Sequence, residues 1–249
     1  MHPILLTLGP VTVYTYGVAM ALAFLVTLWL AARATRGPLR GLVPMTEAAL
    51  IDWGCWTMLG GLLGGRLLYV MENWAFYRSQ PEEILAVWHG GLVWYGGLFG
   101  GLAAQAIFFA RRRYECLAAT DQIIPFAVLG HAIGRLGCFA NGCCYGVPTT
   151  AWYGVRFPGH PIPLVPTQLM ESAGLLGLFV ILQRLQTPAV LRRPGRLFGS
   201  YLIGYAILRW VIERWRGDQA IIRWGMTLPQ LMSVVLFIVG VTLWLRRRS

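Results

Sequence analysis

The chain has 249 residues, of which 57% are hydrophobic and only 12% are charged, and its mean hydropathy is +0.58. These values exclude a disordered chain, a small disulfide scaffold and most soluble enzymes. A formal charge of +11 would suggest nucleic acid as the partner of a soluble protein, but in so apolar a chain the charge is expected to orient it in a membrane. We therefore predict an all-α, polytopic membrane helix bundle that forms a single membrane-embedded domain over residues 1–249, with the lipid bilayer and not nucleic acid as its surroundings.

Seven stretches meet or approach the length of about 20 apolar residues that a membrane-spanning helix needs. In chain order they are 12–32, 48–70, 91–110, 122–139, 167–185, 197–213 and 227–245. The fourth and sixth are short and carry arginines, so neighbouring helices would have to bury them. Two connecting segments, about 71–90 and 140–166, are long enough to form elements on the outer face.

Arginine supplies every basic residue, and its distribution orients the bundle. The segments after the first, third, fifth and seventh stretches, together with Arg184 at the end of the fifth, hold 13 arginines, against 5 in the segments on the other side. Because cytoplasmic loops are enriched in basic residues, we predict the N-terminus outside and the C-terminus inside.

Glycines recur at a spacing of four in the second and third stretches. Gly60 and Gly64 form one such pair, and Gly96 and Gly100 form another. Small residues at this spacing allow helices to approach closely in lipid, so we expect close helix packing at these positions.

Ionisable residues inside the predicted spans are costly and therefore suggest function. Arg66, Arg135, Arg209 and Glu171 fall at a similar predicted depth, toward the outer leaflet. Tyr16 and Tyr95 begin the first and third spans at the same level.

A simpler interpretation is that these arginines reach the headgroups or pair with acids. Arg209 and Glu213, four residues apart, could form an ion pair along one helix. However, only Glu171 and Glu213 are near enough to neutralise three arginines. We therefore expect a cationic pocket with uncompensated charge, for which the abundant anion is a lipid phosphate.

The densest motif is HAIGRLGCFANGCCYG, from His131 to Gly146, and it resembles the signature of the prolipoprotein diacylglyceryl transferase family. The matching positions are Gly134, Arg135, Gly137, Phe139, Asn141 and Gly146.

Five further segments resemble family motifs in the expected order. They are LGPVTVYTYG with Tyr16, GGRLLYV with Arg66, WHGGLVWYGGLFGG with His89 and Tyr95, PTQLMES with Glu171, and YAILRWVIERWRGD with Tyr205, Arg209, Glu213 and Arg216. The resemblance covers nearly the whole chain.

The resemblance implies transfer of a diacylglyceryl group from phosphatidylglycerol to the lipobox cysteine thiol of a prolipoprotein signal peptide, with release of glycerol phosphate. It also implies a multi-pass enzyme of the bacterial cytoplasmic (inner) membrane, with its site toward the outer leaflet and without a cofactor or metal ion.

The roles that follow are expectations. Arg135 and Arg209 would stabilise the leaving phosphate, Glu171 would act as base or orient an arginine, and Tyr95 would donate a hydrogen bond. Substrate binding is expected from Tyr16, Arg66, His89, Asn141, Tyr205, Glu213 and Arg216.

Three cysteines depart from the family pattern or lie beside such a departure. Cys138 stands where the family has Asn, and Cys143, next to Cys144, stands where it has Glu. A structural disulfide or inert thiols is the simplest interpretation. Metal ligation with His131 or His160 lacks a recognised spacing, and a thiol that takes part in chemistry has the least support.

Three other functions stay open. The chain could be a diverged paralogue that uses the same lipid donor with a different acceptor, or a non-catalytic lipid-binding or transport protein. It could also be a membrane thiol-redox protein. The absence of an internal repeat and the placement of charge toward one leaflet weigh against transport.

Overall fold

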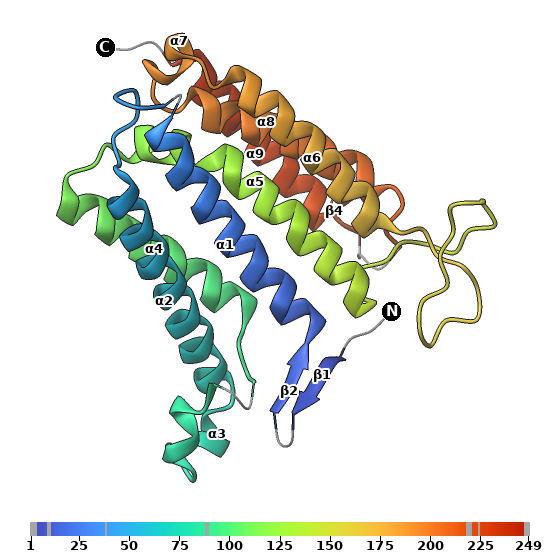
Figure 1. Ribbon diagram of the computed structural model, residues 1–249. Helices are drawn as coiled ribbons and strands as arrows, with labels where there is room; N and C mark the ends of the chain where they lie inside the picture. Colours follow the sequence, from blue (N-terminus) through green and yellow to red (C-terminus); the bar gives the residue numbers. More distant parts are fainter. Residues whose placement is uncertain are drawn as a thin grey trace. The chain divides into compact units, whose positions relative to one another are not determined.

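The computed structural model describes residues 4–8, 11–37, 39–87, 90–217, 221–223 and 225–246, and these are mainly helical (Figure 1). Two compact units can be distinguished. The first unit comprises Met1–Ala31 and Thr120–Ser249, and the second comprises Ala32–Ala119, so the boundaries fall within two long helices. The organisation as one membrane-embedded domain stays a prediction.

The first unit begins with an antiparallel hairpin of β1 (Ile4–Leu8) and β2 (Val11–Tyr14), in which Leu8 pairs with Val11. Helix α1 (Thr15–Arg36) follows directly. The remaining elements are α5 (Cys116–Asn141), α6 (Thr167–Leu185), α7 (Pro188–Leu191), α8 (Arg196–Glu213), the short hairpin β3 (Ile221–Arg223) and β4 (Met226–Thr227), and α9 (Leu228–Leu245).

The core of the first unit lies where α5, α6 and α8 meet. It contains Val128 and Ala132 of α5, Leu175 and Leu182 of α6, and Leu197 of α8. Polar contacts fix the helices around it. Ser172 Oγ donates to the Ala132 carbonyl at 3.0 Å, and the buried Asp121 carboxylate accepts the Gly195 and Phe198 N–H groups, both at 2.7 Å, at the start of α8. These contacts hold α6 and α8 in register against α5, which carries the signature motif.

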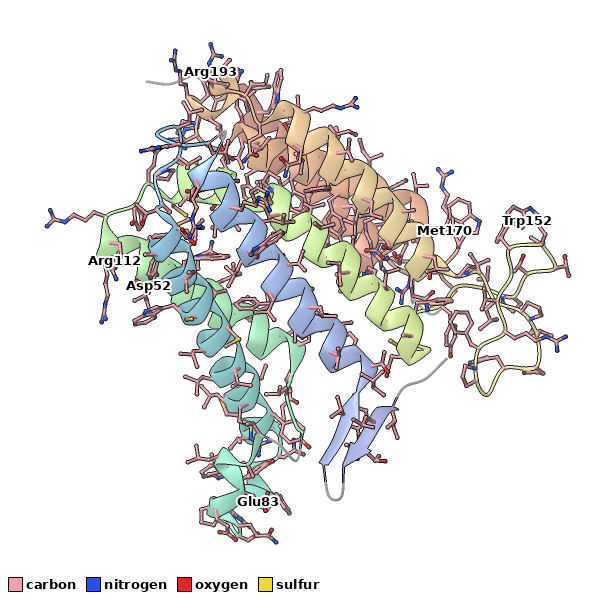
Figure 2. All side chains as sticks on the ribbon, viewed as in Figure 1. Asp52, Glu83, Arg112, Trp152, Met170 and Arg193 are labelled. Atoms are coloured by element: carbon pink, nitrogen blue, oxygen red, sulfur yellow. The ribbon has the colours of Figure 1, made fainter. Side chains whose placement is uncertain are left out.

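A long loop, 142–166, leaves the first unit between α5 and α6. It contains no helix and is held by isolated bridges from Leu164 to Pro148 and to Val155. Trp152 is 95% exposed in this loop, away from the helices of its unit (Figure 2). Part of this segment is therefore exposed, and its placement on the outer face of the membrane stays a prediction.

The second unit is built on α2 (Glu47–Glu72) and α4 (Trp94–Arg112), with α3 (Trp74–Tyr77) and a 3₁₀ turn, η1 (Pro81–Leu85), between them. The two long helices lie side by side (Figure 1). A Cβ atom on Gly64 would lie 2.3 Å from the Gly96 carbonyl oxygen, so only glycine fits at this crossing. The predicted close packing at the glycine pairs is confirmed.

Each of the seven predicted stretches overlaps a helix of 18 or more residues. The described residues are mostly helical, as the predicted helix bundle requires, and they also contain two small hairpins that the sequence did not predict. The predicted first span began at residue 12, yet Val11–Tyr14 is a strand. Its three consecutive β-branched residues favour extended backbone, and the paired strand β1 satisfies its hydrogen bonds.

Three helices of the described residues, α1, α5 and α9, are long and apolar enough to cross a membrane. Helix α9 is the clearest case, because Val235 and Ile238 are more than half exposed while only Ser233 and Gly240 are buried. Such apolar exposure suits lipid and not water. The fold is that of a helical membrane protein.

Candidate active site

Four charged side chains from α5, α6 and α8 form a continuous ion-pair network in the first unit. Arg135 Nη2 donates to Glu171 Oε1 at 2.9 Å, and Arg209 Nη1 lies 3.7 Å from Glu171 Oε2. Arg209 Nη2 also pairs with Glu213 Oε2 at 2.9 Å. Both carboxylates are at most 2% exposed, and the arginine side chains are 18% and 12% exposed. The predicted convergence of Arg135, Arg209, Glu171 and Glu213 is thus observed.

Two arginine N–H groups of the network have no hydrogen-bond acceptor in the part of the chain that the structure describes. Among the described residues, Arg135 Nε and Arg209 Nη1 are buried and have no hydrogen-bond acceptor, since 3.7 Å from Nη1 to Glu171 is too long for one. An unsatisfied buried donor is costly, so these two groups are the candidate positions at which an anion could be bound.

Of the three arginines expected to carry uncompensated charge, Arg135 and Arg209 are compensated. Glu171 and Glu213 match Arg135 and Arg209 one for one, because a cation buried this deeply needs a nearby carboxylate. What the site offers an anion is therefore oriented N–H donors and not an excess of charge.

Aromatic residues border the network. The His131 ring, one helical turn before Arg135, lies 3.9 Å from Glu171 Oε1 through its Nε2 atom, and its centroid is 5.4 Å from that of Tyr205. Tyr205 stacks on Tyr201 at 5.8 Å. The sequence analysis predicted Tyr205 but considered His131 only as a metal ligand. The signal for its place beside the network was its spacing of four residues from Arg135.

Other predicted substrate-binding residues of the first unit lie around the signature motif. The Tyr16 ring is within 3.6 Å of the position that a Cβ atom on Gly137 would occupy, so it packs against the signature helix, and it is 39% exposed. Asn141 ends α5 and is partly buried, and Arg216 is partly buried just beyond α8.

Arg66, in the second unit, is 6% exposed, and its guanidinium N–H groups donate to backbone carbonyl oxygens. Its Nε, Nη1 and Nη2 atoms donate to the carbonyls of five residues: Glu83, Ile84, Ala86, Gly90 and Gly91. The guanidinium thereby organises the segment between η1 and α4.

Tyr95, also in the second unit, lies at the start of α4, is 56% exposed and contacts Trp94 edge-on. His89 lies outside the described residues.

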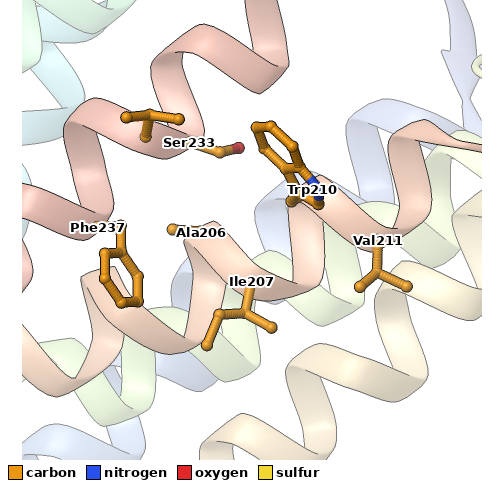
Figure 3. Close-up of a pocket in the computed structure, with 7 residues that line it drawn as sticks. Ala206, Ile207, Trp210, Val211, Ser233 and Phe237 are labelled. Carbon is orange, nitrogen blue, oxygen red and sulfur yellow. The ribbon is translucent and has the colours of Figure 1, made fainter.

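An apolar groove lies between α8 and α9 and has a volume of about 220 Å³. Figure 3 shows Ala206, Ile207, Trp210 and Val211 of α8 facing Ser233 and Phe237 of α9 (Figure 3). None of the residues that line the groove belongs to the ion-pair network.

Cys138, Cys143 and Cys144 form a cluster, which we call the cysteine cluster, at the end of α5. All three are partly buried free thiols, and their Sγ atoms lie within 4.8 Å of one another. The turn that brings them together has positive φ at Gly142 (76°) and at Cys144 (65°). Hydrogen bonding from Cys138 lowers the pKa of the Cys144 thiol to about 5, whereas burial raises the pKa of Cys143.

The histidines considered as metal ligands lie elsewhere. His160 Nε2 is 2.6 Å from the Tyr145 hydroxyl, and His131 lies beside Glu171. Within the described residues, the cysteine cluster offers a metal ion only sulfur ligands, one thiol from each cysteine.

The fold and site define a helical membrane protein with a buried ion-pair network that contains, among the residues described, two unpaired arginine N–H groups. Comparison with known proteins agrees: the family model for prolipoprotein diacylglyceryl transferase matches residues 3–246. Similar proteins include those of Lactobacillus acidophilus (32% identity, 100% of this chain and 91% of the relative) and Methylibium petroleiphilum (35%, 97% and 94%). That of Rhodospirillum rubrum is 34% identical over 100% of this chain and 93% of its own length. Each is named phosphatidylglycerol–prolipoprotein diacylglyceryl transferase. The chain belongs to the prolipoprotein diacylglyceryl transferase family.

Proposed function

We propose that this protein transfers the diacylglyceryl group of phosphatidylglycerol to the thiol of a lipobox cysteine in a prolipoprotein. The new bond is a thioether, and glycerol phosphate leaves. The observation that carries the proposal is the pair of buried, unsatisfied arginine donors, Arg135 Nε and Arg209 Nη1, in a chain that belongs to this family.

The two guanidiniums suit the leaving group. Negative charge develops on the phosphate as the carbon–oxygen bond breaks, and fixed donors in a site with little water stabilise that charge without reorganising. Arginine also stays protonated and can grip a phosphate at two points. The groove between α8 and α9 has the apolar lining that one acyl chain of the donor lipid requires.

Glu171 and Glu213 serve as positioning residues in this proposal. Glu171 accepts a hydrogen bond from Arg135 and faces Arg209, and Glu213 is held in turn by the Thr227 hydroxyl at 2.8 Å. A carboxylate engaged by two guanidiniums is better placed to orient them than to remove a proton. His131, beside Glu171, is the further candidate for the base.

The other predicted residues keep narrower roles. Tyr16, Asn141, Tyr205 and Arg216 would line the substrate site in the first unit, whereas the roles of Tyr95 and His89 rest on their family motif alone. Because its five donors are engaged, Arg66 would support binding by holding the backbone carbonyls of residues 83, 84, 86, 90 and 91.

In the membrane, we propose seven spans in a single domain, with the N-terminus outside and the C-terminus inside. The helices α1, α2, α4, α5, α6, α8 and α9 are the proposed spans, and the arginine distribution supports the orientation. The site would then face the outer leaflet of the bacterial inner membrane.

The test is a transfer assay with purified protein, phosphatidylglycerol and a lipobox peptide, read by the peptide's mass. The proposal expects the mass gain of one diacylglyceryl group and release of glycerol phosphate. A matched peptide with serine in place of the cysteine should gain nothing. No product from a well-folded protein would refute the proposal.

A diverged paralogue with the same donor and another acceptor is the second candidate. The replacement of two signature residues by Cys138 and Cys143 favours it. Release of glycerol phosphate that depends on a different acceptor thiol, while the lipobox peptide stays unmodified, would support this alternative.

A further inference from the structure

The cysteine cluster has the composition of a metal site. It places three Sγ atoms within 4.8 Å of one another, and the Cys143 and Cys144 sulfurs are 3.7 Å apart. Zinc–thiolate bonds of about 2.3 Å put the sulfurs of one site about 3.8–4.0 Å apart, so little movement would be needed to bind an ion. A set of three thiolates without oxygen or nitrogen ligands selects a soft or borderline cation.

The fold holds these sulfurs from two directions. Cys138 is carried by the rigid last turn of α5, and the positive φ at Cys144 turns the chain back toward it. The loop is then fixed to the first turn of α6. Thr167 Oγ1 donates to the Cys144 carbonyl at 2.8 Å, and Gln168 Nε2 donates to the Cys143 carbonyl. Such anchoring is the support that a ligand set needs to keep its geometry.

The cysteine cluster also adjoins the ion-pair network. Cys138 follows Arg135 by three residues and so lies on the same face of α5. Gln168, which holds the cluster's loop, precedes Glu171 by three residues on α6. An ion at the cluster would therefore lie beside the arginines to which the proposed function assigns the leaving phosphate.

We propose that the cysteine cluster binds Zn²⁺ through Cys138, Cys143 and Cys144 and that the open fourth position takes the acceptor cysteine thiol. This inference rests on the proposed function and deepens it, because it assigns the activation of the nucleophile. Zinc sites with three protein ligands keep one position for water or substrate.

The chemistry balances without a redox change. The acceptor thiol loses its proton to water on binding Zn²⁺. A sulfur lone pair then forms the carbon–sulfur bond to the glyceryl carbon, while the carbon–oxygen bond to phosphate breaks and its electrons leave with glycerol phosphate. Zn²⁺ keeps its three protein ligands and its charge throughout, and the thioether product, a weaker ligand than a thiolate, is released.

Cobalt(II) is the probe for binding, because it replaces zinc in tetrahedral sites and its thiolate charge-transfer band reports sulfur ligands. The full-length protein in detergent would be stripped with chelator under reducing conditions and titrated with Co²⁺. We expect one equivalent to produce the band. Adding a lipobox cysteine peptide should raise its intensity by roughly one third, because a fourth thiolate joins three. The serine peptide should leave it unchanged.

Variants localise the site. Cys138→Ser, Cys143→Ser and Cys144→Ser should each weaken or abolish the band, whereas Cys55→Ser, which changes an exposed cysteine of α2, should not. The rise of the charge-transfer band on addition of the cysteine peptide is measured on the wild-type protein, so this test holds even if a variant fails to fold.

The rate of diacylglyceryl transfer tests whether the metal ion activates the acceptor thiol. At pH 6.5 a free thiol of pKa about 8.5 is only about 1% thiolate, so removing the metal should slow transfer by up to about 100-fold, and Zn²⁺ should restore it. The stripped enzyme should gain rate by about tenfold per pH unit up to that pKa, while the zinc enzyme should not.

Four results would overturn the inference. They are the absence of a charge-transfer band, a disulfide among these cysteines in protein isolated without reductant, a band that does not respond to the cysteine peptide, and transfer that is indifferent to chelation. If the band forms and responds to the peptide but no diacylglyceryl group is transferred with any metal, the metal site stands and the proposed function fails.

Discussion

At the scale of single residues, the arrangement of charge decides the chemistry. Arg135 and Arg66 are both buried arginines from helices, but Arg135 is paired with a carboxylate and keeps an unused donor, whereas Arg66 is saturated by carbonyls. The sequence could predict that Arg135, Arg209 and Glu171 share a depth. It could not predict how each guanidinium is used, because hydrogen-bond partners depend on loops whose path the helical pattern does not fix.

Glu171 is the residue on which the network depends. Replacing it by Gln would keep its shape but leave Arg135 and Arg209 facing each other without their shared carboxylate. We expect Glu171→Gln to lower the free energy of unfolding by about 3 kcal/mol, since breaking a buried ion pair leaves an uncompensated charge. Thermal unfolding in detergent would measure it, with the exposed Glu82→Gln as the control. Equal stability of both variants would show that the network is not electrostatically coupled.

Arg66→Lys tests the structural role assigned to that side chain. Lysine has three donors and arginine has five, so at least two of the five carbonyls would lose their partner. At about 1 kcal/mol for each lost bond, amide exchange of residues 84–87 should become about 30-fold faster. Hydrogen exchange followed by mass spectrometry measures this, with the exposed Arg78→Lys as control. Unchanged exchange would argue that Arg66 is free for substrate.

At the scale of elements, local sequence rules performed well for helices and poorly for short extended segments. The seven apolar stretches coincide with long helices, and the glycine pairs of α2 and α4 mark a close crossing, because both patterns repeat along one helix face. The hairpins before α1 and α9 were not predicted, since two strands stabilise each other only by pairing. The cysteine cluster was also missed as a unit, because the turn at Gly142 and Cys144 creates a proximity that the spacing does not show.

Gly64→Ala tests the helix crossing in the second unit. The added Cβ atom would meet the Gly96 carbonyl oxygen at 2.3 Å and force α2 and α4 apart. We expect a loss of about 1–3 kcal/mol in the free energy of unfolding, as for other overpacked sites. Gly61→Ala on the same helix is the matched control, since its Cβ atom would lie 3.4 Å from the nearest atom. Equal melting temperatures for Gly64→Ala and Gly61→Ala would contradict the close-packing argument.

At the scale of the whole molecule, composition identified a helical membrane protein, and the ordered motifs identified its family. The number of spans and their orientation rest on apolar length and on arginine distribution. In the part of the chain that the structure describes, three helices meet the criteria of length and apolarity by themselves. The others carry charged or glycine-rich faces, as expected for helices whose neighbours cover them.

Reporter fusions test the proposed topology. A periplasmic phosphatase joined after the C-terminal arginines should be inactive, and the same reporter placed in the loop 142–166 should be active, because phosphatase folds only outside the cytoplasm. Replacing Arg246, Arg247 and Arg248 by neutral residues should weaken the retention of the C-terminus inside. An active C-terminal fusion in the unaltered chain would contradict the N-out, C-in arrangement.

The central claim is that Arg135 and Arg209 together hold the phosphate that leaves from the donor lipid. The most direct measurement is the rate of glycerol phosphate release from phosphatidylglycerol for Arg135→Ala and Arg209→Ala, compared with Arg156→Ala, which changes an exposed arginine of the loop 142–166. We predict that each of the first two loses about 100- to 1,000-fold in rate while the third matches the wild type. Wild-type release by either Arg135→Ala or Arg209→Ala would contradict the claim.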